Sequence, residues 1–179
     1  LGLTGQTIAV TGAAYDLATA TLAANSVSFG NVRTGVTNNL SLTNTVLTGG
    51  NATYQDDLAA VASKTNANLT VSSPADIAAG SSANLGLTAF SAGSLADTVS
   101  LALTSKVQTG VSGLTNVGLA GQSVAVTGAA YDFAQPTVAA TLALSNVRAR
   151  SAGSLAVTNA VVTDAAFQDS LDVTATTAV

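Results

Sequence analysis

The chain of 179 residues contains no cysteine, histidine, methionine or tryptophan, and all nine of its acidic residues are aspartates. Without histidine and cysteine, it lacks the usual general base, the thiolate nucleophile and the soft or borderline metal ligands. These absences exclude zinc sites, haem, iron–sulfur clusters and catalysis by Cys–His or Ser–His pairs. They predict a protein that is not an enzyme and that holds no cofactor of these kinds.

Basic residues and long apolar runs are also scarce. Five lysines and arginines against nine aspartates give a formal net charge of −4, and the pI is near 4.2. Such a chain offers no basic stripe for phosphates, so nucleic acid is not expected as a partner. Mean hydropathy is +0.46, but no run approaches the roughly 18 apolar residues of a transmembrane helix. The N-terminus shows no secretion signal, so any signal peptide is expected to have been removed already.

The residues that remain favour strands over helices. Thr, Val, Ser, Gly and Asn are abundant, whereas Glu and Met are absent and Lys and Arg are few. Alanine is frequent, but Thr and Val interrupt it too often for a helical apolar stripe to form. The predicted fold class is therefore all-β.

A long internal repeat runs along the chain. Residues 5–18 read GQTIAVTGAAYDLA and residues 121–134 read GQSVAVTGAAYDFA, so eleven of fourteen positions are identical at an offset of 116. Three shorter matches follow in the same order, at offsets between 115 and 113: 31–33 with 146–148, 40–44 with 155–159, and 54–58 with 167–171. The repeated unit thus has the size of one immunoglobulin-like (Ig-like) domain.

Within one unit, apolar and polar residues alternate in roughly seven short runs that are separated by Gly, Asn, Ser and Pro turns. This pattern predicts tandem Ig-like antiparallel β-sandwiches. We expect residues 1–18 to be the closing strand of a preceding repeat, 19–133 a complete repeat and 134–179 a partial second repeat. Because half a sandwich exposes strand edges, either a longer tandem array or strand addition between subunits is expected to complete it.

Four motifs carry a family resemblance. Residues 27–35 read VSFGNVRTG, 40–45 read LSLTNT, 77–82 read IAAGSS and 124–128 read VAVTG. In this order they resemble the bacterial choice-of-anchor D repeats, which are Ig-like sandwiches related to hydin-type and major-sperm-protein-like domains. The second unit departs from the pattern at Ser145-Asn146, which stand where Phe29-Gly30 would be expected, and at Arg150, which replaces the turn glycine Gly35. The resemblance covers one whole unit and both flanking fragments, and it implies a location on the cell surface.

Aspartates in the turns are the candidate metal ligands. Hard carboxylate oxygens suit calcium, which extracellular β-domains bind in turns between strands. The alternative is that short runs of aspartate in turns are simply solvated. The calcium candidates are Asp56, Asp57, Asp169 and Asp172.

Two Tyr-Asp pairs occupy equivalent positions where one unit ends and the next begins. Tyr15-Asp16 and Tyr131-Asp132 are predicted to fix the junction between domains rather than to catalyse a reaction. Arg33 and Arg148 are equivalent as well, and each follows Asn-Val at a strand end. Either they pair with a junction aspartate or they are solvated.

These observations predict a non-enzymatic structural subunit of an extracellular bacterial filament, sheath or surface layer, built head to tail from Ig-like repeats. Its expected partner is itself, through self-assembly that includes exchange of strands between subunits. The lack of oxidation-prone residues suits such exposed material. The alternative is an adhesin or stalk of a larger cell-surface protein, in which the repeats project a distant binding domain.

Overall fold

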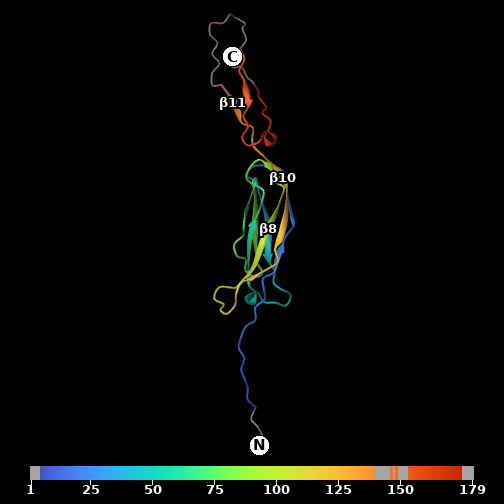
Figure 1. The fold of residues 1–179 in the computed structure, drawn as a ribbon, viewed down its shortest axis with the longest axis vertical. Coiled ribbons are helices and arrows are strands. Elements are labelled where there is room, and N and C mark those ends of the chain that lie inside the picture. The colour runs from blue at the N-terminus through green and yellow to red at the C-terminus, as the bar shows by residue number, and fades with distance from the viewer. Residues whose placement is uncertain (1–4, 140–145, 147, 149–152, 175–179) are drawn as a thin grey trace.

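Residues 20–131 form two β-sheets that pack face to face as a sandwich in the computed structural model, which describes residues 5–139, 146, 148 and 153–174 (Figure 1). The all-β prediction is confirmed. No helix in the described part of the chain is long and apolar enough to cross a membrane. The strands of the sandwich are β1 (Ala20–Leu22), β2 (Ser26–Arg33), β3 (Thr37–Asn44), β4 (Asp57–Ser63), β5 (Leu69–Ser72), β6 (Ser82–Ala89), β7 (Gly93–Ser94), β8 (Asp97–Lys106), β9 (Val117–Gly118) and β10 (Gln122–Tyr131).

One sheet has the strand order β1-β3-β6-β5, and the other has the order β2-β10-β8-β4, with β7 beside β10 and β9 beside β8. All these neighbours are antiparallel except β2 and β10, which are parallel. The prediction of wholly antiparallel sheets is therefore wrong at this pair. The chain enters the second sheet along β2 and leaves it along β10 in the same direction. Residues 5–14 consequently extend from one end of the sandwich, and the segment after β10 extends from the other (Figure 1).

The core lies between the two sheets and consists mainly of leucine and valine. Side chains that alternate along the strands point inward, and the small polar residues between them face solvent. Each fully buried Leu or Val contributes about 1.5–3 kcal/mol relative to exposure. The fully buried apolar side chains include Leu42, Leu58, Leu69, Leu85, Leu87, Leu95, Val99 and Val124.

Asp97, the first residue of β8, holds the turn between β4 and β5. Its carboxylate accepts hydrogen bonds from the N–H groups of Thr65 and Asn66, both at 2.9 Å, and from the Thr65 hydroxyl at 2.7 Å. Thr98 N–H adds a bond of 2.8 Å. Desolvation raises the pKa of Asp97, but the bonds from Asn66, Thr65 and Thr98 outweigh it and lower the pKa to about 2.

We expect Asp97→Ala to destabilise the sandwich by about 1–2 kcal/mol at pH 7, because donors in the turn lose their acceptor while water partly replaces it. The folded pKa of Asp97 lies below its unfolded value of 3.8. Its contribution is therefore complete above pH 4 and is lost as the pH falls through about 2. Urea unfolding of both proteins at pH 7 and pH 2 should show the difference between them shrinking at the lower pH.

The matched control for this prediction is Asp76→Ala. Asp76 pairs with Lys106 at the exposed surface, where ion pairs contribute less than about 1 kcal/mol. A difference between wild type and Asp97→Ala that is the same at both pH values would contradict the prediction.

Candidate interaction site at two equivalent junctions

The N-terminal junction, formed by Tyr15, Asp16, Tyr54 and Gln55, lies where the chain enters the sandwich. Asp16 N–H donates to the Tyr54 carbonyl at 2.8 Å, and Asp56 N–H donates to the Asp16 carbonyl at 2.9 Å. Tyr15 packs edge-on against Tyr54, with ring centroids 5.5 Å apart. The two segments are thereby joined through both backbone and side chains.

Asn44, the last residue of β3, ties this junction to the core. Its Oδ1 accepts from Thr19 N–H and from Gln55 Nε2, both at 3.0 Å. Its Nδ2 donates to the carbonyls of Asp56 at 2.9 Å and Ile77 at 3.0 Å. The Asn44 side chain is fully buried, and these four bonds use its full hydrogen-bonding capacity.

The C-terminal junction, formed by Tyr131, Asp132, Phe167 and Gln168, repeats this backbone pattern. Asp132 N–H donates to the Phe167 carbonyl at 2.9 Å, and Asp169 N–H donates to the Asp132 carbonyl at 3.0 Å. The rings of Tyr131 and Phe167 lie 5.7 Å apart. Each bond has its counterpart at the N-terminal junction.

Asn159 occupies the position of Asn44 at the C-terminal junction. Its Oδ1 accepts from Gln135 N–H at 2.8 Å and from Gln168 Nε2 at 2.9 Å, and its Nδ2 donates to the Asp169 carbonyl at 2.8 Å. A short antiparallel pair, β11 (Pro136–Val138) with β12 (Val157–Asn159), follows the C-terminal junction (Figure 1). It corresponds to the antiparallel pair of β1 with β3 that follows the N-terminal junction. The short 3-10 turns η1 (Ala52–Tyr54) and η2 (Ala165–Phe167) also correspond.

The structure therefore places both predicted Tyr-Asp pairs at contacts between segments that are distant in sequence. Sequence reasoning did not single out the amide network of Asn44 and Gln55 or its counterpart. The signal was present, because Asn44 and Gln55 both fall inside the repeated stretches. Their side-chain roles became visible only with burial and bonding.

Arg33 joins the sandwich to the segment that follows it. From the end of β2, its Nη1 donates to the Asp169 carboxylate, and its guanidinium lies 5.0 Å from the centre of the Phe133 ring. A hollow of about 450 Å³, which Tyr131 also lines, adjoins this pair. Of the two alternatives for Arg33, pairing with a carboxylate is the one observed, and the partner is Asp169. Such a partly exposed ion pair contributes about 0.2–1 kcal/mol.

The four candidate calcium ligands do not share a site. Asp56 is buried and accepts from the Ser105 hydroxyl at 2.8 Å, whereas Asp57 is partly exposed on β4. Asp169 pairs with Arg33, and Asp172 is exposed. Within residues 5–139 and 153–174, no three acidic side chains gather closely enough to hold a metal ion.

Two buried carboxylate oxygens at the junctions have no hydrogen-bond partner among the residues that the structure describes: Oδ1 of Asp56 and Oδ2 of Asp132. Exposed fractions of 4% for Asp56 and 9% for Asp132 leave them little contact with water. An unpaired buried polar atom lowers the stability of a folded protein by about 1–3 kcal/mol. Both oxygens therefore mark places where a hydrogen bond is missing within the described chain.

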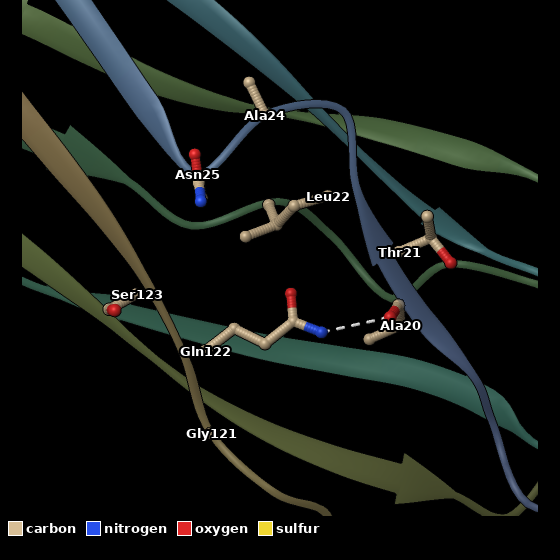
Figure 2. A pocket seen from close by; sticks show the side chains of 8 residues that line it. All are labelled: Ala20, Thr21, Leu22, Ala24, Asn25, Gly121, Gln122 and Ser123. Atoms are coloured by element: carbon tan, nitrogen blue, oxygen red, sulfur yellow. Dashed lines mark hydrogen bonds between the residues drawn. The ribbon is translucent and has the colours of Figure 1, made fainter.

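A separate hollow of about 560 Å³ lies between β1 and the start of β10 (Figure 2). Gln122 spans it and donates from Nε2 to the Ala20 carbonyl at 3.0 Å, and Leu22 projects into the same space. The residues that line it include Thr21, Asn25 and Ser123, and none of its lining side chains is titratable. The hollow is an opening at the side of the sandwich and lacks the groups that acid–base chemistry requires.

Comparison with known proteins adds no identity to these observations. No protein family, curated protein or solved structure matches the chain.

Proposed function

We propose that this chain is a non-enzymatic structural subunit of an extracellular bacterial assembly, a filament, sheath or surface layer made of tandem Ig-like sandwiches joined head to tail. The observation that carries the proposal is that the same junction closes twice, 116 residues apart. No flexible linker intervenes, because β10 ends at Tyr131 and Asp132 already bonds to the next segment. Junctions without an intervening linker suit an extended rod.

Residues 5–14 support self-association. They repeat most of the sequence of β10, in which Val124 and Val126 are 0% and 1% exposed between the sheets. Their equivalents, Ile8 and Val10, are 84% and 91% exposed. Burying each would contribute about 1.5–3 kcal/mol. We infer that this segment closes a neighbouring sandwich beside its β2 and β8, either earlier in one array or by strand addition between subunits.

An extracellular location is consistent with the composition. The chain lacks Cys, Met and Trp, which are sensitive to oxidation, and its five lysines and arginines offer few sites for trypsin-like proteases. The resemblance to choice-of-anchor D repeats points in the same direction. Few reactive side chains are compatible with a building material that is exposed outside the cell.

A stalk or adhesin region of a larger surface protein is the second candidate. The parallel pairing of β2 with β10 supports the stalk and the building block equally. Because the chain enters and leaves the sandwich at opposite ends, successive domains would project along one line. The two candidates differ in what the purified chain does. A building block polymerises, whereas a stalk segment stays monodisperse.

Val10→Asp tests self-assembly. Negative-stain images of the wild-type chain should show filaments with an axial repeat of tens of ångströms, about one sandwich length. The variant should raise the concentration needed for assembly by at least about tenfold, because it places a charge on the face that becomes buried. Light scattering across a concentration series measures this shift.

Val61→Asp is the matched control, because Val61 is an exposed valine on β4 outside the repeated segment. It should leave the assembly threshold unchanged. Monodisperse rods from both the wild type and Val10→Asp would overturn the building-block proposal in favour of the stalk.

A further inference from the structure

The unpaired oxygen of Asp56 is unusual because the side chain is buried and its other oxygen is hydrogen-bonded. Asp56 is 4% exposed, and its Oδ2 accepts from the Ser105 hydroxyl at 2.8 Å. Its Oδ1 is buried and has no hydrogen-bond partner within residues 5–139 and 153–174. A carboxylate has room for about four hydrogen bonds, so a donor is missing on one side.

The equivalent residue, Asp169, shows which donor fits. The backbones of the two residues are placed alike, since each N–H donates to the junction aspartate, Asp16 or Asp132. The Asp169 carboxylate accepts from Arg33, which reaches it from the end of β2 in the preceding sandwich. Asp56 and Asp169 hold the same position in the repeat. The Asp56 carboxylate is bonded to a serine, and the Asp169 carboxylate is bonded to an arginine.

A second feature of the N-terminal junction agrees with this comparison. Arg33 lies over the ring of Phe133, and the repeat places Leu17 at the position of Phe133. Leu17 is exposed in the described chain. An arginine that approached Asp56 along the same path would therefore find an apolar side chain for its aliphatic stem.

We propose that Asp56 is the docking point for an arginine of the preceding unit, namely the residue that corresponds to Arg33. The contact rests on the head-to-tail order proposed above and names the residue pair that sets it. When the chain assembles with copies of itself, the corresponding residue is Arg148, which is exposed. The Asp56 carboxylate then has one oxygen bound to Ser105 and the other to an arginine from the neighbouring sandwich.

The test uses a tandem chain in which residues 19–120 precede residues 5–179. Because residues 5–18 repeat residues 121–134, this chain restores a complete preceding unit with its own copy of Arg33. Asp56→Asn should lower the thermal midpoint of the tandem chain by about 2–4 °C. In the original chain, the same substitution should leave the midpoint unchanged or raise it, because it removes a buried and incompletely paired charge.

Changing the preceding copy of Arg33 to Gln should lower the midpoint of the tandem chain by a similar amount, and combining both substitutions should add no further loss. Asp57→Asn controls for charge and should have equal effects in the two chains. Equal losses from Asp56→Asn in both chains, or additive losses in the double variant, would overturn the proposed contact. Filament formation by the original chain is measured separately, so its absence would count against the proposed function and would not decide this contact.

Discussion

Gly128→Ala should destabilise the sandwich by on the order of 3–4 kcal/mol, because no side chain fits at this point of β10. Gly128 has a φ of +132°, which L-residues rarely adopt, and the register between β10 and β2 shifts at this residue. A Cβ here would lie 2.7 Å from the Gly30 carbonyl oxygen and 2.8 Å from the Phe29 Cβ. The first of these neighbours is backbone of a paired strand, so it cannot move aside cheaply.

Urea unfolding followed by circular dichroism measures this loss, and the repeat supplies the matched control. Gly12 is the equivalent residue, and nothing lies within 4 Å of a Cβ added there. Gly12→Ala should change the stability of the sandwich by less than about 0.5 kcal/mol. If residues 5–14 close a neighbouring sandwich, Gly12→Ala should nevertheless impair assembly. Small and equal losses of stability in both variants would contradict the close approach of β10 to β2.

The core could be predicted from the sequence because its signal is local. Period-2 alternation identifies Leu85 and Leu87 or Val124 and Val126 as residues that point inward, and all four are buried. The junctions could also be located, because the repeat brings Tyr15-Asp16 and Tyr131-Asp132 into alignment. Their partners in the turns after β3 and β12 lie tens of residues away, and nothing local to the Tyr-Asp pairs identifies them.

The residues of a strand that point inward do not reveal which strand lies beside it or in which direction that strand runs. Alternation along β2 and β10 would be the same whether they paired in parallel or antiparallel, so the direction of this pair could not be read from it. The burial of two adjacent aspartates could not be predicted from the sequence either. Asp56 is buried and Asp57 is partly exposed, because successive residues point to opposite faces and the turn before β4 fixes which one turns inward.

The buried role of Asn44 could not be predicted from composition. Asparagine is common in this chain and is usual in exposed turns, so its presence at a strand end predicts solvent contact. The structure instead places it at the centre of a buried amide network with Gln55. Such a network holds the turn against the core with neutral groups that need no counter-charge.

Asn44→Ala is therefore expected to cost about 3–5 kcal/mol in the free energy of unfolding. It removes both acceptor bonds, from Thr19 and Gln55, and both donor bonds, to Asp56 and Ile77. Bulk water does not reach these groups, because the side chain is fully buried. Urea unfolding should show a lower midpoint with an unchanged slope, since the loss lies in the folded state.

Asn159→Ala separates the contribution of burial to stability from the contribution of the hydrogen bonds. Asn159 makes three equivalent hydrogen bonds, to Gln135, Gln168 and Asp169, but it is exposed in the described chain. Water can take over these bonds, so the substitution should cost less than about 1 kcal/mol. A loss as large as that of Asn44→Ala would mean that the bonds themselves carry the stability. A small loss in both variants would mean that the junction is held by its backbone bridge and aromatic pair.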